Sequence, residues 1–319
     1  HQGFAFHADP SVTLEEDLAR RDLTINAIAK SSDGKLIDPF QGIDDLKKRT
    51  LRHVSDAFIE DPLRVFRVCR FTATLDFNIY PDTLKLMVRL VNTGELSTLS
   101  TERVWNEILK GLMGKKPSLM IDSLTKCGAL EAINSSLSNG VYDEKNKTFI
   151  YTALDLAATN TLSIETRVAI FCLLTEHDVK KVIEQHSARI TARKNVSRDL
   201  LAQLRATKSQ NQTSMLFLGY LGSILNANEL SNEQIVDLVM CLDGLRNPDR
   251  FKKILDAAST VGQALIKQNY TDHIRILMRS LNILKSIRHD DLTKIDSTAE
   301  INQRVRYARI NALDTELSR

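Results

Sequence analysis

The stretch from Glu60 to Arg70, E-D-P-L-R-V-F-R-V-C-R, predicts an amphipathic helix with a high concentration of arginine. Its polar residues recur at every third position, namely Asp61, Arg64, Arg67 and Arg70. Steps of three residues spread these side chains across about half of a helix circumference, and the apolar residues between them can face a core. Asp61 directly before Pro62 is typical of a helix start.

Arginine suits planar, two-pronged hydrogen bonding to phosphates and base edges, so this face is a candidate for nucleotide recognition. A surface helix with solvated arginines has the same pattern. Residues elsewhere in the chain are needed to choose between a nucleotide-binding face and a solvated surface helix.

The composition favours a mainly helical protein that binds nucleic acid only locally, if at all. The chain has 319 residues, of which 43% are hydrophobic, and this predicts two or more compact units. Glycine (12) and proline (6) are scarce, and 6% of the residues are aromatic. The formal net charge is +3, so any surface that binds nucleic acid has to be a local patch.

The cysteines and the apolar runs indicate a cytoplasmic protein. The four cysteines are far apart and form no C-x-x-C pair, which favours reduced thiols over a zinc site or a disulfide framework. No apolar run is long enough to span a membrane, and no signal peptide is recognisable. The first residue is His1 rather than methionine, so we expect the sequence to begin inside a longer chain.

Periodicity and capping signals predict a small mixed region followed by a long helical body. In the mixed region we expect an extended segment at residues 1–10, a helix from Thr13 through Ala29, a strand at Lys35–Pro39, a helix at Ile43–Lys48 and a strand at Leu51–Val54. Further helices are expected at Pro81–Val91, Thr101–Met113, Pro117–Lys126, Lys147–Ala158, Ile164–Leu174, Asp178–His186, Ser197–Ala206, Ser214–Asn226, Asn232–Leu245, Pro248–Val261, Asp272–Ile287 and Ala299–Leu313. Ser135–Asn146 is the best candidate for a linker.

Three segments, in this order, resemble the class II tRNA nucleotidyltransferases, the CCA-adding enzymes, and most closely their gammaproteobacterial branch. They are R-R-D-L-T-I-N-A-I-A at 20–29, the run from L-I-D-P-F to V-C-R-F at 36–71, and T-L-S-T-E-R-V-W-N-E-I at 98–108. The related bacterial poly(A) polymerases share the E-D-P-x-R core, but R-H-V-S-D-A-F-I before it looks more like the CCA-adding type. The resemblance implies a remnant of the nucleotidyltransferase head at 1–55, a helical neck with the nucleotide-selecting motif at 56–135, and a helical body at 136–319.

The resemblance also implies a set of nucleotide-binding residues. The R-R-D-x-T-x-N-A motif would place Arg21 on the incoming nucleotide, while Arg20, Asp22 and Asn26 shape the pocket around its sugar and triphosphate. A helix with an ion-pair cluster is the alternative for this triplet.

In the second motif, Asp61 and Arg64 would act as a protein template that reads the Watson–Crick edge of CTP or ATP. A carboxylate accepts a hydrogen bond from the exocyclic amine that cytosine and adenine carry, and arginine donates to ring nitrogens or carbonyls. The pair therefore favours C and A over U and G. Arg67 and Arg70 would either contact phosphates or hold the template pair in place.

The implied reaction is attack of the tRNA 3′-hydroxyl on the α-phosphate of CTP or ATP, with release of pyrophosphate. In this family Mg²⁺ is held by a D-x-D pair near a Gly-rich segment, and the sequence contains neither. We therefore expect no catalytic residue and no metal ligand within this chain. Asp44 and Asp45 are adjacent and are interpreted as solvated surface acids.

In the body, His177 and Asp178 stand where related enzymes carry an HD-type phosphohydrolase, but the usual H-D-x-G-K continuation is missing, which indicates a degenerate HD-like scaffold. Two basic segments are weaker candidates for tRNA contacts, with solvated helix faces as the alternative. They comprise Arg189, Arg193, Lys194 and Arg198, and Arg304, Arg306 and Arg309.

The preferred interpretation is a cytoplasmic CCA-adding enzyme with tRNA, CTP and ATP as its partners. One alternative is a poly(A) polymerase or an A-adding relative. Another, of a different class, is a non-catalytic RNA-binding protein derived from a nucleotidyltransferase.

Overall fold

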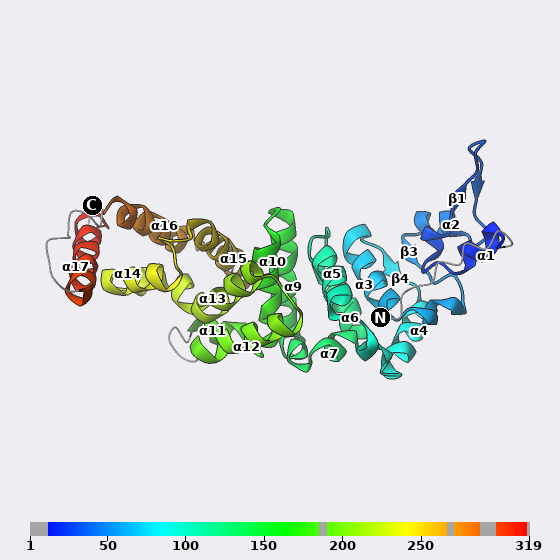
Figure 1. The fold of residues 1–319 in the computed structure, drawn as a ribbon, viewed down its shortest axis with the longest axis horizontal. Helices are drawn as coiled ribbons and strands as arrows, with labels where there is room; N and C mark the ends of the chain where they lie inside the picture. The colour runs from blue at the N-terminus through cyan, green and yellow to red at the C-terminus, as the bar shows by residue number, and fades with distance from the viewer. Residues whose placement is uncertain (1–11, 185–189, 267–270, 288–297, 318–319) are drawn as a thin grey trace. The chain divides into compact units, whose positions relative to one another are not determined.

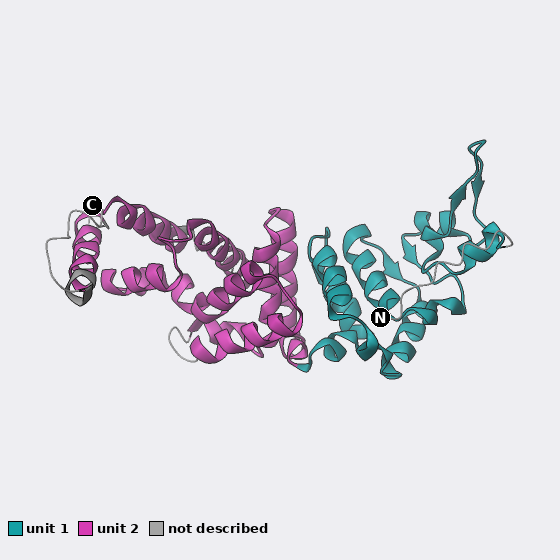
Figure 2. Ribbon diagram, viewed as in Figure 1, with its two compact units in different colours: residues 1–135 teal, residues 136–319 magenta. Residues whose placement is uncertain are grey.

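The computed structural model describes residues 12–184, 190–266, 271–287 and 298–317, and it confirms a mainly helical fold with a small mixed region (Figure 1). The chain divides into two compact units, residues 1–135 (unit 1) and 136–319 (unit 2), coloured separately in Figure 2. The strands of the described residues all lie in unit 1. The extended segment expected at residues 1–10 lies outside the described part of the chain.

Unit 1 begins with α1 (Leu14–Ala19), which starts as predicted but ends early. The side chains and backbone of Thr13 and Glu16 form the expected capping box. The prediction that the helix continues to Ala29 is wrong. Thr24 instead donates its backbone N–H to the Arg52 carbonyl at 2.9 Å, so pairing with a distant segment replaces helical hydrogen bonds.

After this break, short elements form two small sheets. Strand β1 (Ala29–Lys30) pairs antiparallel with β2 (Leu36–Ile37) across a turn in which Gly34 has a φ of +89°. Helix α2 (Gly42–Lys47) leads to β3 (Thr50–Leu51). The parallel partner of β3 is β4 (Asn78–Ile79), a strand that the sequence analysis missed.

The helical part of unit 1 is organised around α3 (Leu63–Leu75), which packs against α5 (Thr101–Leu112) and α6 (Pro117–Lys126). Val65, Val68 and Cys69 are fully buried, so the apolar face predicted for this helix does form core. Asp61 lies two residues before the first helical residue, Leu63, and its carboxylate accepts the Leu63 backbone N–H. The other elements of this part are η2 (Asp56–Glu60), α4 (Pro81–Asn92), η3 (Glu95–Thr98), α5 (Thr101–Leu112), α6 (Pro117–Lys126) and α7 (Ala129–Ile133).

Unit 2 is helical throughout its described residues, and its core surrounds α13 (Lys208–Leu225). This helix packs against α10 (Ile164–Phe171), α12 (Ile190–Gln203) and α15 (Pro248–Ile266). The linker expected at Ser135–Asn146 instead contains two short helical elements, η4 (Ser135–Ser138) and α8 (Asn139–Tyr142). Burial of Leu137 and a hydrogen bond from Asn146 Nδ2 to the Glu176 carbonyl at 3.1 Å tie this segment to the fold.

The remaining elements of unit 2 largely follow the predicted helices. They are α9 (Glu144–Thr159), α10 (Ile164–Phe171), η5 (Cys172–Thr175), α11 (Val179–Glu184), α12 (Ile190–Gln203), η6 (Ala227–Glu229), α14 (Asn232–Cys241), α15 (Pro248–Ile266), α16 (Thr271–Ser286) and α17 (Thr298–Leu317).

Some general properties bear on function. The four cysteines are free thiols, as predicted. Among the described residues, no helix has both the length and the apolar character needed to cross a bilayer.

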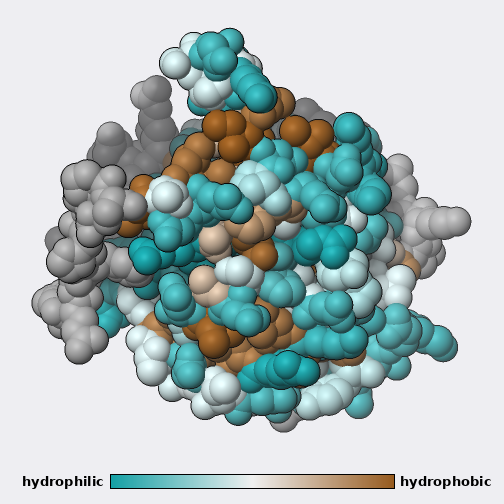
Figure 3. Space-filling view, turned by 90° about the vertical axis from the view of Figure 1, so that its right-hand side faces the viewer, coloured by the Kyte–Doolittle hydropathy of each residue, from teal (hydrophilic) through white to brown (hydrophobic). Residues whose placement is uncertain are grey.

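Figure 3 shows apolar patches between polar side chains on one face of the molecule. Unit 1 exposes several large apolar side chains, including Val12, Leu14, Leu36, Leu46 and Ile59.

Candidate nucleotide-binding site

Unit 1 contains a polar hollow of about 490 Å³, a volume within the range of small-molecule pockets. It lies where the turn after α1 meets the start of α3. It brings together most of the nucleotide-binding residues that the sequence analysis proposed, namely Arg20, Arg21, Asp22, Asn26, Asp61, Arg64 and Arg67. Three further residues complete the lining, namely Leu63, Phe71 and Arg103. Three segments that are far apart in the chain therefore form one site.

Asp61 occupies the turn between η2 and α3 with its carboxylate at the pocket. Its Oδ1 accepts the backbone N–H of Leu63 at 3.2 Å, and its Oδ2 faces Arg103 Nη2 at 3.3 Å. The side chain is 22% exposed. A carboxylate can accept about four hydrogen bonds, so this one keeps acceptor positions for a ligand.

Arg64 connects three parts of the site. Its Nη1 donates to the Ala57 carbonyl at 2.6 Å, and its Nη2 donates to the Arg20 carbonyl at 2.5 Å. A guanidinium has five N–H donors in a fixed plane, so donors remain for a ligand after these two bonds. The side chain is thereby held in one orientation at the wall of the pocket.

Asp22 anchors Arg67 in the lining of the pocket. The Asp22 carboxylate accepts hydrogen bonds from Leu23 N, Asn26 Nδ2 and Arg67 Nε at 2.7–3.0 Å. Burial is the largest single influence on this carboxyl and would raise its pKa. The hydrogen bond from Asn26, the charge and hydrogen bond of Arg67 and the bond from Leu23 together outweigh burial, so the pKa of Asp22 lies below its usual value.

Arg70 lies outside the pocket lining and joins α3 to α5. Its Nε donates to the buried carboxylate of Glu107, which also pairs with Lys110 Nζ at 3.1 Å. Burial would raise the pKa of Glu107, but hydrogen bonds and charge from Arg70 and Lys110 hold it below the usual value. The Arg70 guanidinium lies 3.9 Å from the centre of the Phe71 ring. Of the two roles considered for Arg70, this geometry favours holding the template helix in place.

The pocket is positively charged overall, because five arginines and two aspartates line it. Arg20 and Arg21 are exposed at its edge, and Arg21 pairs with Asp17 at 2.9 Å. A concave surface with excess positive charge attracts anions such as a triphosphate.

Sequence reasoning missed Arg103 and Phe71. Arg103 lies within the third motif, four residues before Glu107, a spacing that places both side chains on one face of a helix. That spacing was visible in the sequence. Nothing in the sequence alone, however, shows that this face of α5 meets α3.

The first basic segment of unit 2 is only partly available to RNA. Arg189 lies outside the described residues. Arg193 is buried, with Glu176 at 3.9 Å, so the prediction of an RNA contact there is corrected. Lys194 lies over the Tyr220 ring at 4.9 Å, and Arg198 is exposed and pairs with Asp199 at 3.0 Å.

The second basic segment lies on α17. Arg304 is exposed. Arg306 faces Glu233 at 2.6 Å and Asp237 at 2.9 Å, both on α14, so acids distant in sequence balance its charge. Arg309 is half-buried, and burial lowers its pKa. Residues 304–309 include no acidic residue, but they do not form a free basic surface, because carboxylates of α14 pair with Arg306.

The HD-like dyad shows no metal-binding geometry. His177 and Asp178 are both exposed, and Asp178 Oδ1 accepts the Lys181 backbone N–H at 3.0 Å near the start of α11. Across residues 12–184, 190–266, 271–287 and 298–317, no three His, Cys, Asp or Glu side chains come together as a possible metal site.

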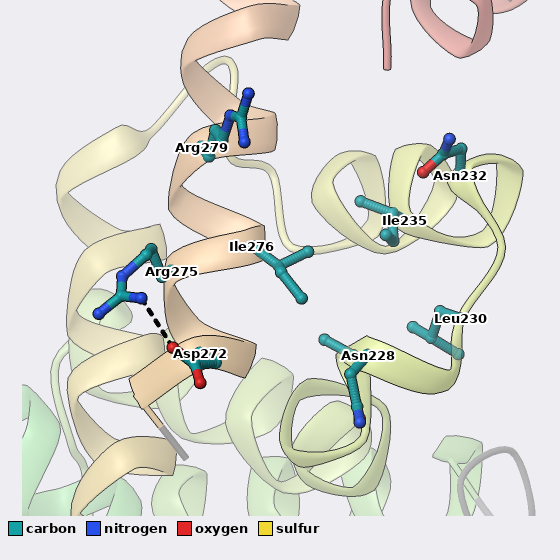
Figure 4. A pocket seen from close by; sticks show the side chains of 9 residues that line it. Asn228, Leu230, Asn232, Ile235, Asp272, Arg275, Ile276 and Arg279 are labelled. Carbon is teal, nitrogen blue, oxygen red and sulfur yellow. Dashed lines mark hydrogen bonds and ion pairs between the residues drawn. The ribbon is translucent and has the colours of Figure 1, made fainter. Parts of the chain in front are cut away.

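A second hollow, of about 340 Å³, lies in unit 2 between η6, α14 and α16 (Figure 4). Its cations already have partners. Arg275 pairs with Asp272 at 2.7 Å, and Arg279 donates to the Glu316 carbonyl. Its lining combines these groups with apolar residues such as Ile235 and Ile276, and it contains no set of groups suited to catalysis.

Two family models match the chain. The model "Poly A polymerase head domain" matches residues 4–52, and "Probable RNA and SrmB- binding site of polymerase A" matches residues 76–139. The first of these includes the R-R-D motif.

Curated relatives and solved structures cover almost the whole chain. The "Multifunctional CCA protein" of Dechloromonas aromatica (strain RCB) is 38% identical over 98% of this chain and 80% of that protein. The protein of the same name from Methylobacillus flagellatus (strain ATCC 51484 / DSM 6875 / VKM B-1610 / KT) is 34% identical with the same coverage. The fold resembles the Bacillus stearothermophilus CCA-adding enzyme in complex with CTP, with a TM-score of 0.67 and 23% identity over 95% of this chain and 71% of that one. It also resembles the Thermotoga maritima CCA-adding enzyme complexed with tRNA(CCA), with a TM-score of 0.66 and 18% identity over 95% and 70% of the two chains. The chain therefore belongs to the family of the multifunctional CCA proteins, the CCA-adding tRNA nucleotidyltransferases.

Proposed function

We propose that this protein adds C and A to the 3′ ends of tRNA, using CTP and ATP and releasing pyrophosphate. The observation that carries the proposal is the pocket of unit 1, where Asp61 and Arg64 lie beside the R-R-D motif. Family membership supports the reaction class, and the pocket supports the choice of nucleotide.

The proposed selection of the base rests on complementary hydrogen bonding. The Asp61 carboxylate accepts from the 4-amino group of cytosine or the 6-amino group of adenine, and Arg64 donates to the adjacent ring nitrogen. Uracil and guanine present a carbonyl oxygen where the amino group stands, so two acceptors would face each other. No nucleic-acid template is needed for this discrimination.

The triphosphate is proposed to lie along the arginine-rich edge. Arg20 and Arg21 are exposed there, and Arg67 is fixed by Asp22. Guanidinium groups bind phosphate oxygens through two parallel hydrogen bonds. These residues bind and orient the nucleotide, so that the α-phosphate can meet the 3′-hydroxyl of the tRNA.

Mg²⁺ is proposed from the family, whose chemistry generally depends on metal ions that activate the hydroxyl and stabilise the leaving group. Among the described residues no cluster of acidic, histidine or cysteine side chains fits such an ion. The proposed cytoplasmic location rests on the free thiols.

For tRNA, the exposed cations of unit 2 remain candidates for phosphate contacts. Arg198 and Arg304 are the most accessible of the residues proposed from the sequence, although Arg198 has Asp199 beside it. Such contacts would recognise the backbone and shape of the RNA rather than its bases.

The test uses the native gene product and a tRNA that ends before its CCA. With CTP and ATP together, we expect two C residues and one A to be added, while ATP alone gives no A on this end. Addition of A to any RNA end, with no use of CTP, would support a poly(A) polymerase or an A-adding enzyme instead. Binding of tRNA without any addition would support the non-catalytic alternative.

A further inference from the structure

The carboxylate proposed to read the base is itself held by a side chain from another helix. Asp61 Oδ1 is engaged by the Leu63 backbone N–H, and Oδ2 faces Arg103 Nη2 at 3.3 Å. One oxygen is therefore fixed from within its own turn and the other from α5. Both residues line the same hollow, which places their contact beside the base position.

Arg103 is well placed to control that carboxylate. It lies in the first turn of α5, where its backbone N–H faces the Ser100 hydroxyl that caps the helix. Its side chain is 42% exposed. One helical turn later, Glu107 holds Arg70. Helix α5 thus supplies two side chains to this region, one that meets Asp61 in the turn before α3 and one that meets Arg70 on α3 itself.

We propose that Arg103 is a positioning residue that determines nucleotide specificity by fixing the orientation of the Asp61 carboxylate. This inference rests on the proposed function, because it assumes that Asp61 accepts the amino group of the base. Arg103 is not proposed to contact the base.

The physical reason is that discrimination needs an acceptor that cannot turn away. A fixed carboxylate meets the amino group of cytosine favourably and the O4 of uracil unfavourably. Without Arg103, Asp61 can rotate about its side-chain bonds, which weakens the bond to cytosine and relieves the repulsion of uracil. Both changes lower the ratio of kcat/KM for CTP to kcat/KM for UTP.

The experiment compares the native gene product with its Arg103→Met and Arg103→Lys variants. Arg89→Met is the matched control, because Arg89 is an exposed arginine on α4 of the same unit and does not line the hollow. The readout is kcat/KM for CTP divided by kcat/KM for UTP. We expect Arg103→Met to lower this ratio about tenfold, Arg103→Lys to lower it less because a cation is retained, and Arg89→Met to leave it unchanged.

A purely structural role predicts a different result. If Arg103 only braced the fold, Arg103→Met would lower activity with CTP and UTP by the same factor, and the unchanged ratio would overturn the proposal. Should Arg103→Met fail to fold, the Lys variant decides, since it retains charge but loses the planar fork. Wild-type discrimination in a folded Arg103→Lys would then overturn the proposal.

A double-mutant cycle separates this inference from the proposed function. Adding Arg103→Met to Asp61→Ala should cause no further loss of discrimination, because the group to be positioned is gone. If Asp61→Ala lowers the ratio but Arg103→Met does not, the inference fails while the proposed function stands. If Asp61→Ala has no effect either, the assignment of the base-reading pair fails as well.

Discussion

Replacing Asp22 with Asn is expected to destabilise unit 1 by about 2–3 kcal/mol. The Asp22 side chain is 6% exposed and is paired with Arg67 through a contact of 2.7 Å. Removing one partner of a buried pair leaves the other uncompensated, which costs ~3–5 kcal/mol when both are fully buried. Arg67 is 36% exposed, so water can partly replace the carboxylate. We therefore expect a smaller loss of stability than for a fully buried pair.

The cost should also depend on pH. Because the folded-state pKa of Asp22 lies below its usual value, its stabilising contribution is present above the pKa of the unfolded chain and is lost as the pH falls through the folded value. The difference between wild type and Asp22→Asn should therefore be constant near neutral pH and shrink below about pH 4.

The measurement is urea unfolding of the full chain followed by fluorescence. Trp105 is the single tryptophan of the sequence and is buried in α5, so its signal reports on unit 1. Asp17→Asn is the control, because its pair with Arg21 is exposed on both sides and should contribute about 0.3–0.5 kcal/mol. Equal losses in the two variants at pH 7 would contradict the account of Asp22.

Replacing Gly42 with Ala is expected to cost about 3 kcal/mol or more. A Cβ on Gly42 would lie 2.7 Å from the carbonyl carbon of Thr24 and clash with its oxygen. Neither side can move easily. The Thr24 hydroxyl donates to the buried Asp45 carboxylate at 2.7 Å, and the Gly42 backbone N–H donates to Asp38 Oδ1 at 2.7 Å.

Gly111→Ala provides the comparison in the same unit. A Cβ there would meet the Met120 side chain rather than backbone. Methionine adapts its rotamers readily, and Ala favours helix over Gly by ~0.5–1 kcal/mol. We therefore expect a much smaller loss of stability, measured by the same Trp105 fluorescence. A Gly42→Ala variant as stable as Gly111→Ala would show that the 3-10 turn η1 (Thr24–Asn26) and α2 are not packed as described.

The sequence could predict helices well because their signals are local. The capping box at Thr13 and the proline starts of α4 and α6 formed where expected. The end of α1 could not be predicted, since no glycine or proline follows it before Gly34 to mark where the helix stops. Their backbone groups pair with residues near Arg52 instead, a contact between segments about 30 residues apart. Strand β4 has two residues and offers no pattern to detect.

The site shows the same division between local and distant information. Motif residues identified candidates for the pocket, but their actual contacts depend on tertiary packing. Asp45 was interpreted as a solvated acid, yet it is 3% exposed and binds Arg52 and Thr24. Arg70 had two possible roles in the sequence analysis, and its contact with Glu107 favours the structural one. The positions of charged residues in the sequence do not show which of them form ion pairs in the folded protein.

Asp61 and Arg64 are proposed to select the base. The most direct test is the ratio of kcat/KM for CTP to that for UTP in the native gene product and in its Asp61→Ala and Arg64→Ala variants, with Arg89→Ala as the control. A well-formed pair of hydrogen bonds discriminates by about 1–3 kcal/mol. We expect each substitution at the site to reduce the ratio about tenfold or more, and the control to preserve it. Wild-type selectivity in both Asp61→Ala and Arg64→Ala would contradict the claim.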